Sequence, residues 1–321
     1  MLDFLKFKRS VDFIDMKKLF AFAICLCMIS VLPGCEPKHP PDNPKTDFPV
    51  TVGDLVIRSA PQKVVSLSPS ITEIIYSLGS YARLIGVSDY CDFPPEIEAL
   101  PKLGNQILPD IDAIIALGAD LVLCSGELPA GDLERLQAQK INVIIVSPGV
   151  DADLFELFNA VSSVLSGYLT GEATARRAAG LVNAEYDRVA EAVPAASAKA
   201  CLFLSASGDV ATPDTFAGQL LEKARAVNAA QGGSNFSFPI EELASQMPEF
   251  IFCPKTDVEA YKSNPALAEA PAVQKGQVIG VDTVLFERQG ERAAEAVKTL
   301  AALMYPEQAS YLLTVSDQPG H

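Results

Sequence analysis

The chain has 321 residues, of which 49% are hydrophobic and 20% are charged, and its formal net charge is −15. This composition is typical of a folded globular protein, and the length is enough for two lobes of ordinary domain size. The negative charge repels a phosphate backbone, and no basic stripe in the sequence offsets it. We therefore expect no nucleic-acid partner.

The segment from Met16 to Cys35 has the features of an export signal. Two lysines precede an apolar run that is too short to span a bilayer comfortably, and the segment ends in the tetrapeptide Leu32–Cys35. This ending resembles a bacterial lipobox, which implies cleavage before Cys35 and a diacylglyceryl group on its thiol. We assign residues 1–35 to a signal peptide. Acidic residues precede the lysine pair, where a signal peptide normally begins with positive charge, so we expect translation to start at Met16. A plain membrane anchor is the alternative.

The residues that follow Cys35 predict a tether. Removal of residues 1–34 leaves 20 Lys and Arg and 37 Asp and Glu, so the mature chain carries a net charge of −17. Residues 36–49 are rich in proline and polar side chains and offer little to bury. We assign residues 36–60 to a linker that stands an acidic domain off the membrane, on the periplasmic side or on the outer cell surface.

From Lys63 onward, short apolar runs alternate with helical stretches. The expected strands are 64–67, 84–87, 121–123 and 143–146, and the expected helices are 70–78, 111–117 and 133–139. Strands that are almost continuously apolar and alternate with helices predict a parallel sheet that is covered on both faces. We assign residues 61–150 to an N-terminal α/β lobe.

Residues 196–321 repeat this pattern as a C-terminal α/β lobe. The expected strands are 201–204, 250–252 and 278–281, and the expected helices are 219–228, 240–246 and 291–303. Between the lobes, residues 151–195 read as helix almost throughout, interrupted by Gly167 and Gly171, and a continuous helix of this length would cross a whole domain. Parallel strands bring the loops at their carboxyl ends to one crevice, so the fold class is α/β with a ligand cleft between two lobes.

Catalytic motifs are missing from the sequence. The mature chain has only His39, in the expected linker, and His321, its last residue, whereas Ser-His-Asp and Cys-His catalysis and histidine-containing zinc sites need an imidazole inside the fold. There is no G-x-S-x-G elbow, phosphate loop or dinucleotide fingerprint. Acidic residues such as Asp89, Asp92 and Glu242 are more simply explained by a solvated face. We expect no enzyme, no cofactor and no resident metal. The alternatives from other classes are a metal-assisted hydrolase and a surface adhesion or sensory protein.

The cysteines after the lipid site are few and widely spaced. They are Cys91, Cys124, Cys201 and Cys253, and no two form a C-x-x-C pair. Three of them adjoin apolar runs of strand type, so we expect small buried hydrophobic residues. A disulfide between Cys91 and Cys124 is the alternative.

Several segments, in a consistent order, carry a family resemblance. They are Val64–Glu73, Gly86–Glu96, Pro101–Gly104, Ile114–Val122, Asn228–Gly233, Pro239–Leu243 and Pro271–Val278. Together they resemble the periplasmic-binding-protein family that serves cobalamin and iron-siderophore importers, over about residues 60–306. The resemblance implies two Rossmann-like lobes bridged by a long rigid helix, and a monomeric receptor that hands its ligand to an ABC permease and, through it, to a separate ATPase.

The segments Ser68–Glu73 and Ser88–Pro95 are most similar to those of cobalamin receptors. The resemblance therefore implies cobalamin or a related corrinoid as the ligand. Some cobalamin receptors have a tryptophan after the strand at 121–123, whereas this chain has Cys124 there and no tryptophan anywhere. A ferric siderophore or haem therefore stays open as the ligand.

Loops that follow strands supply the candidate ligand contacts. Tyr90 can lay its ring against a corrin or porphyrin face while its hydroxyl stays solvated, and the alternative is a tyrosine that closes the core. Phe286 can add an apolar contact, and Arg288 a cation for carboxylate, amide or phosphate groups. An arginine exposed only for solubility is the alternative there. Hydrogen bonds are expected from Ser68, Ser70, Ser125 and Asp209.

Glu73 and Glu241 are assigned a different role by the resemblance. In cobalamin receptors, matching glutamates, one on each lobe, dock arginines of the permease, and exposed charge pairs of this kind mainly steer and orient partners. Helix-surface glutamates without a partner are the alternative.

Overall fold

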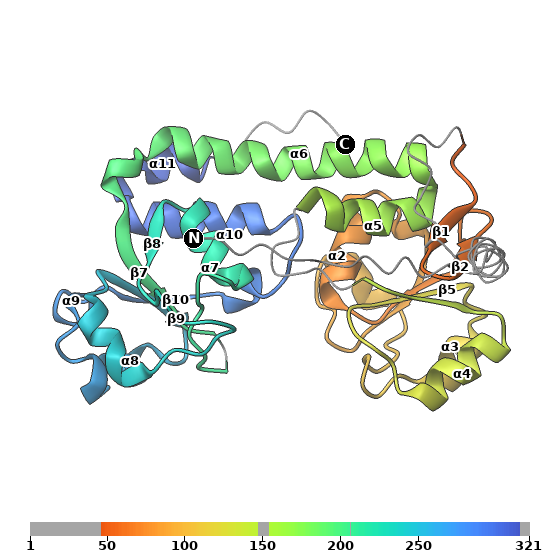
Figure 1. Ribbon diagram of the computed structural model, residues 1–321, viewed down its shortest axis with the longest axis horizontal. Helices are drawn as coiled ribbons and strands as arrows, with labels where there is room; N and C mark the ends of the chain where they lie inside the picture. Colours follow the sequence, from red (N-terminus) through yellow and green to blue (C-terminus); the bar gives the residue numbers. More distant parts are fainter. Residues whose placement is uncertain (1–45, 147–153, 206, 315–321) are drawn as a thin grey trace, which may run out of the picture. The chain divides into compact units, whose positions relative to one another are not determined.

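The computed structural model describes residues 46–146, 154–205 and 207–314, which form a mixed α/β fold (Figure 1). The predicted signal peptide and Cys35 lie outside these residues. Within the described ranges, every helix is too short or too polar to cross a membrane.

The N-terminal lobe contains a four-stranded sheet in the order β4-β3-β5-β6, with all neighbours parallel. Its strands are β3 (Val64–Ser66), β4 (Leu84–Val87), β5 (Leu121–Cys124) and β6 (Asn142–Ile145). Its helices are α2 (Pro69–Ser77), α3 (Ile111–Ala116) and α4 (Ala130–Ala138), with short 3₁₀ turns η1 (Tyr81–Arg83) and η2 (Pro95–Ala99). Strands β3 and β5 are buried throughout, as strands covered on both faces must be. The parallel sheet predicted for this lobe is confirmed.

The C-terminal lobe contains a second parallel sheet, in the order β10-β9-β7-β8. Its strands are β7 (Lys199–Phe203), β8 (Ala226–Asn228), β9 (Phe250–Pro254) and β10 (Val278–Val281). Its helices are α7 (Phe216–Lys223), α8 (Val258–Lys262), α9 (Pro271–Gln274), α10 (Ala293–Met304) and α11 (Ala309–Leu312). The 3₁₀ turns are η3 (Ala195–Ser197), η4 (Ile240–Gln246), η5 (Pro265–Leu267), η6 (Thr283–Phe286) and η7 (Pro306–Gln308). In both sheets the first strand lies between the second and the third, so the two lobes share one topology.

The helix predicted for 219–228 is wrong at its C-terminal end. Helix α7 ends at Lys223, and Ala226–Asn228 form strand β8 beside β7. Arg225 has a left-handed backbone, with φ of 64°, which turns the chain out of the helix. A strand of three residues directly after a helix is too short to produce an alternating pattern, so the sequence offered little signal for it.

The connection between the lobes is two helices rather than one. Helices α5 (Leu154–Ser166) and α6 (Tyr168–Ala192) pack side by side, and the chain reverses at Gly167, whose φ is 90° (Figure 1). Gly171 does not interrupt the helix. It lies inside α6, where a Cβ would come within 2.7 Å of the backbone of Ser163, so glycine permits the close approach of the two helices.

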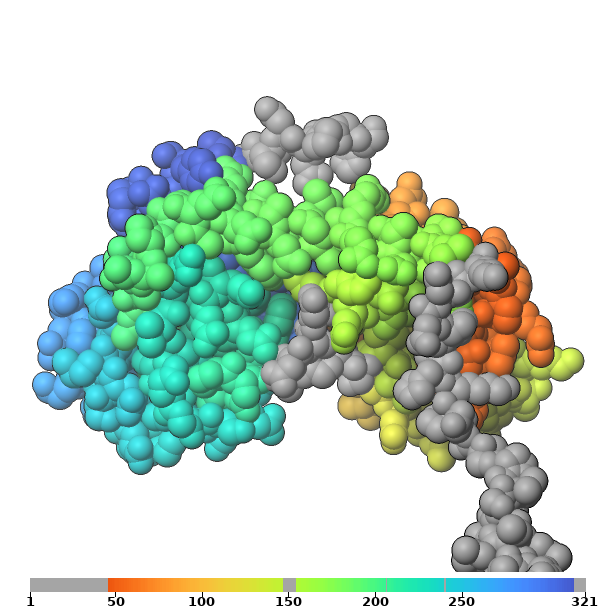
Figure 2. Space-filling model, turned by 45° about the horizontal axis from the view of Figure 1, so that its top comes forward, coloured from red at the N-terminus to blue at the C-terminus, as the bar shows by residue number. Residues whose placement is uncertain are grey.

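Helix α6 is the long helix shared by the two lobes, about 37 Å at 1.5 Å per residue. It contacts α5, which packs on α2 of the N-terminal lobe, and it also contacts α7, α10 and α11 of the C-terminal lobe. Its outer side lies at the surface of the molecule (Figure 2). The α/β fold class predicted from the sequence is confirmed. The long helix that connects the two lobes is α6 alone.

The linker predicted for residues 36–60 is wrong for the part that the structure describes. Strands β1 (Val50–Val52) and β2 (Leu55–Ile57) form an antiparallel hairpin whose Val50 and Ile57 are core residues. Tyr168 holds the hairpin to the start of α6, because the Thr51 amide donates to its hydroxyl at 2.9 Å. Two short runs rich in β-branched residues, 50–52 and 55–57, flank a Gly-Asp turn and were the available signal. Three residues each produce little pattern, and the proline-rich stretch before them obscured it.

All four cysteines of the described residues are free and buried. The prediction of small buried hydrophobic residues is confirmed, and the alternative disulfide between Cys91 and Cys124 is not formed. Burial raises the pKa of Cys124 and of Cys253 to about 11, so both thiols stay protonated at neutral pH.

Candidate functional site

Ligands of open parallel sheets bind at the carboxyl ends of the strands, where the strand order reverses. That reversal lies between β3 and β5 in the N-terminal lobe, and between β7 and β9 in the C-terminal lobe. The loops that leave these strands and their neighbours are therefore the candidate ligand-binding surfaces of the two lobes.

Tyr90 lies on the loop after β4, and its side chain is 66% exposed. Two hydrogen bonds fix the base of this loop: the Asp89 amide donates to the Gly104 carbonyl at 2.8 Å, and the Gly104 amide donates to Asp89 Oδ1 at 2.9 Å. The Tyr90 amide donates to Ser88 Oγ at 3.2 Å. A fixed loop thus presents an exposed aromatic ring, as predicted for a ligand contact, and Tyr90 does not close the core.

Ile107 and Leu108 form a second exposed apolar feature of the N-terminal lobe that the sequence reasoning missed. They are 71% and 76% exposed, and both of their amides donate to Asn105 Oδ1, which folds the turn that presents them. This turn lies against the end of β5, because Ser125 Oγ donates to Gln106 Oε1 at 2.9 Å. An adjacent apolar pair between Gly104 and Pro109, outside any periodic pattern, was the signal available in the sequence.

We call Tyr90, Ile107 and Leu108 the N-lobe apolar surface. Both loops belong to the connection between β4 and α3, and hydrogen bonds between Asp89 and Gly104 join them. Exposed large apolar side chains on linked loops are candidates for a binding surface.

In the C-terminal lobe, Asp209 is exposed on the loop after β7. Ser207 Oγ donates to Asp209 Oδ2 at 2.5 Å, and the Asp209 amide donates to Ser205 Oγ at 3.2 Å. The carboxylate therefore accepts one intramolecular hydrogen bond. Because Asp209 is exposed, its other acceptor positions face solvent. This placement is compatible with the hydrogen bond to a ligand that the sequence predicts.

Asp214 organises a neighbouring turn that presents Phe236. Its carboxylate accepts from the hydroxyls of Thr212 and Ser234 and from the Asn235 amide. These bonds, that of Thr212 foremost, lower the pKa of Asp214 to about 2. Phe236 follows in a left-handed conformation, with φ of 63°, and is an exposed aromatic residue on this lobe that the sequence reasoning also missed.

The two serines expected at the end of β3 are less accessible. Ser68 is buried, and its carbonyl accepts from the hydroxyls of Ser66 and Thr72. Ser70 is half-buried in the first turn of α2. The burial of Ser68 argues against the predicted ligand contact, whereas Ser70 and Ser125 are partly exposed to solvent.

Phe286 lies in the core of the C-terminal lobe. Its side chain is 1% exposed, and its ring centroid is 4.5 Å from that of Phe203 on β7. The hydrophobic effect explains this position without a ligand. The structure therefore argues against Phe286 as a ligand contact.

Arg288 and Glu73 were given separate roles by the sequence, but they pair with each other. Arg288 Nη1 donates to Glu73 Oε1 at 2.8 Å, and Arg292 donates to both oxygens of the same carboxylate, at 2.8 and 3.0 Å. The Glu73 side chain is only 3% exposed. Because it is enclosed by two guanidinium groups, Glu73 is not free for an arginine of a permease, and Arg288 is not free for a ligand.

Glu241 differs from Glu73 in this respect. It lies in the first turn of η4, its side chain is exposed, and no ion pair joins it to another described residue. Of the two predicted docking glutamates, only Glu241 is placed where a partner protein could reach it.

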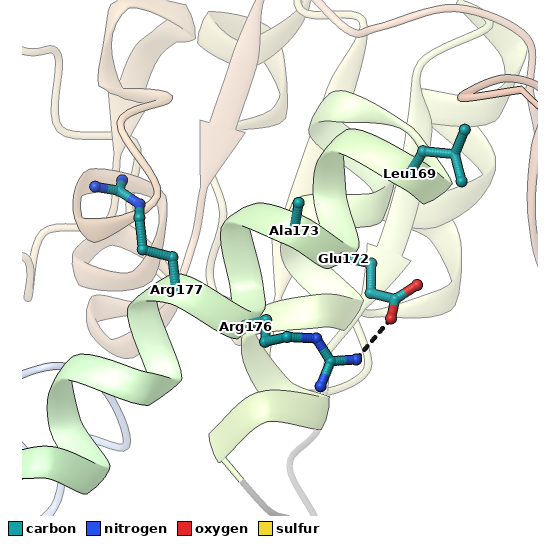
Figure 3. A pocket seen from close by; sticks show the side chains of 5 residues that line it. All are labelled: Leu169, Glu172, Ala173, Arg176 and Arg177. Atoms are coloured by element: carbon teal, nitrogen blue, oxygen red, sulfur yellow. Dashed lines mark hydrogen bonds and ion pairs between the residues drawn. The ribbon is translucent and has the colours of Figure 1, made fainter.

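The surface also has a shallow hollow on α6, lined by Leu169, Glu172, Ala173, Arg176 and Arg177 (Figure 3). Arg176 donates to Glu172 at 2.7 Å. All lining residues belong to one helix, so the hollow has no opposing wall. Within the described ranges, no three histidine, cysteine or acidic side chains gather as a metal site would require.

Comparisons with known proteins bear on this architecture. The family model described as periplasmic binding protein matches residues 64–285. YvrC of Bacillus subtilis, named an uncharacterized ABC transporter substrate-binding lipoprotein, is 28% identical over 91% of this chain and 98% of its own length. A cobalamin-binding protein of Halobacterium salinarum is 25% identical over 88% of this chain and 82% of its own. The structure of a periplasmic haem-binding protein of Pseudomonas aeruginosa superposes with a TM-score of 0.65 at 25% identity, covering 77% of this chain and 93% of that one.

Proposed function

Because this chain belongs to the periplasmic binding protein family and is a substrate-binding protein of an ABC transporter, we propose that it captures cobalamin or a related corrinoid and delivers it to the permease. The cobalamin-binding relative, matched over most of both chains, supports this ligand. Haem or a ferric siderophore is the second candidate, favoured by the haem-binding structure at the same level of identity. The absence of catalytic motifs supports a receptor without turnover.

The observation that carries this proposal is the N-lobe apolar surface. A corrin or porphyrin is a large ring with an apolar face, and stacking against an exposed aromatic side chain is a favourable contact for such a face. Tyr90, Ile107 and Leu108 present such contacts from hydrogen-bonded loops. Tyr90 directly follows β4, and Ile107 and Leu108 lie on the turn that Gln106 joins to Ser125 at the end of β5. The exposed Asp209 on the other lobe supplies an acceptor for polar groups at the ligand edge.

The test is ligand binding by calorimetry with Tyr90→Ala. We expect the purified protein to bind cyanocobalamin or cobinamide one to one, and Tyr90→Ala to weaken binding by about tenfold to a hundredfold, the usual cost of an anchoring aromatic residue. Tyr81→Ala is the matched control, because Tyr81 is also exposed but precedes β4, at the opposite end of the same strand. Haemin and several ferric siderophores are titrated in parallel. Binding of one of these alone would replace the corrinoid, and binding of none would refute the proposal.

A lipid anchor at Cys35 is part of the proposal, supported by the lipobox-like ending and by the lipoprotein name of YvrC. We expect Cys35→Ser to leave the precursor uncleaved or to release the protein from membranes, because thioether attachment requires the thiol. Membrane fractionation and mass spectrometry of the mature N-terminus measure both effects. A mature wild-type chain that starts at another residue and carries no lipid would contradict this prediction.

We also propose that Glu241, rather than the pair with Glu73, is the accessible carboxylate for docking to the permease. Its exposure supports this role, and exposed charges of this kind chiefly orient the partner.

A further inference from the structure

Two arginines of the C-terminal lobe reach into the N-terminal lobe. Arg288 follows η6, and Arg292 is the residue that caps the start of α10, whereas their shared partner Glu73 is on α2. Between them, Gly290 lies beside α2, where an added Cβ would be in ordinary van der Waals contact with the Ile74 side chain, at 3.9 Å. We call Arg288, Arg292 and Glu73 the arginine bridge.

The arginine bridge also touches the loop that presents Tyr90. Arg288 donates to the Asp92 carboxylate and, at 3.4 Å, to the Tyr90 carbonyl oxygen. The Arg292 guanidinium lies 4.2 Å from the centroid of the Phe93 ring, a cation–π contact. Three residues of the segment Tyr90–Phe93 are therefore contacted from the other lobe.

The two positive charges of the arginine bridge face two carboxylates, Glu73 and Asp92. A buried carboxylate is costly unless it is paired and hydrogen-bonded, and Glu73 receives three donated bonds from two guanidinium groups. A cation at a helix N-terminus is unfavourable, so the carboxylate beside Arg292 offsets the charge at the start of α10. The hydrogen bond from Arg288 lowers the pKa of Asp92, which therefore stays ionised at neutral pH.

We propose that Arg288 and Arg292 are positioning residues for ligand capture, which hold the Tyr90–Phe93 segment of one lobe from the other lobe. This inference rests on the proposed function, in which Tyr90 contacts the ligand. Glu73 anchors both arginines, and Arg288 and Arg292 orient the segment through its carbonyl, its carboxylate and its aromatic ring. The placement of the ligand-facing tyrosine thus depends on the contact between the two lobes.

Two readouts test the proposal with the variants Arg288→Gln and Asp92→Asn. The first is hydrogen exchange of the amides of Asp89, Tyr90 and Cys91 without ligand, all three of which are hydrogen-bonded in the structure. The second is the affinity for cyanocobalamin and haemin. We expect Arg288→Gln to speed exchange about tenfold and to weaken binding about tenfold. Asp92→Asn removes the charge of one exposed partner while leaving Glu73 paired, so it should move both readouts in the same direction by less.

Lys298→Gln is the matched control. Lys298 is on α10, pairs with Glu185 at 2.8 Å and is comparably shielded, but it does not touch the Tyr90–Phe93 segment. It should change neither readout. Arg288→Lys keeps the positive charge but lacks the planar guanidinium group. It should therefore restore only part of the protection of these amides against hydrogen exchange.

The outcomes separate this proposal from the proposed function. Faster exchange with unchanged affinity would overturn the positioning role, and lost affinity with unchanged exchange would make Arg288 a direct ligand contact instead. If the wild-type protein binds none of cyanocobalamin, haemin and the ferric siderophores, the proposed function fails. Unchanged exchange in Arg288→Gln would separately refute the claim that Arg288 holds the Tyr90–Phe93 segment.

Discussion

Replacement of Phe286 by alanine is expected to lower the free energy of unfolding by about 3–5 kcal/mol. The side chain is fully buried and its ring contacts Phe203, itself fully buried on the central strand β7. Truncation removes the transfer free energy of the ring and leaves a cavity that the surrounding sheet and helices fill only in part. Urea denaturation followed by circular dichroism measures the change.

Phe236→Ala is the control for this prediction. Phe236 is an exposed phenylalanine of the same lobe, so its removal should change the free energy of unfolding by no more than about 0.5 kcal/mol. If Phe286→Ala left stability unchanged and weakened ligand binding, the ring would be a ligand contact after all, as its loop position in the sequence suggested.

Replacement of Glu73 by alanine is expected to lower the free energy of unfolding by on the order of 3 kcal/mol. The substitution leaves Arg288 and Arg292, both largely shielded from water, without their shared carboxylate. The cost falls at the lower end of the range for broken buried pairs because Arg288 keeps Asp92. Glu287→Ala is the matched control, since this glutamate is adjacent to Arg288 in the chain but exposed, and it should have little effect.

The same variant distinguishes the arginine bridge from a docking role. A glutamate that only docks a permease would be dispensable for stability, and raised salt would mimic its loss because exposed pairs are screened over about 8 Å at physiological ionic strength. We expect the opposite for Glu73, with a destabilised receptor and a salt dependence weaker than that of an exposed pair. Wild-type stability together with weakened binding to the permease would restore the docking assignment.

The sequence by itself determined the class of the fold. Continuous apolar strands alternating with helices can be buried only in a parallel sheet covered on both faces, and both sheets follow this rule. It also predicted the exposed Tyr90 loop after β4 and the four free, buried cysteines. These are local properties, because apolar periodicity and turn residues act over a few positions. Short elements such as β8 and the hairpin of β1 and β2 were missed because three residues produce too little pattern.

Only the tertiary structure decided what the polar and aromatic candidates do. Phe286 and Tyr90 both follow strands, yet one is packed against Phe203 and the other is exposed, which depends on what lies opposite each loop. Glu73 and Arg288 are 215 positions apart, and nothing local to either one indicates that they pair across the two lobes. A charged residue gives the same local sequence signal whether its side chain is solvated, bound to a ligand or buried in an ion pair. Its role follows from the partners that the fold brings to it.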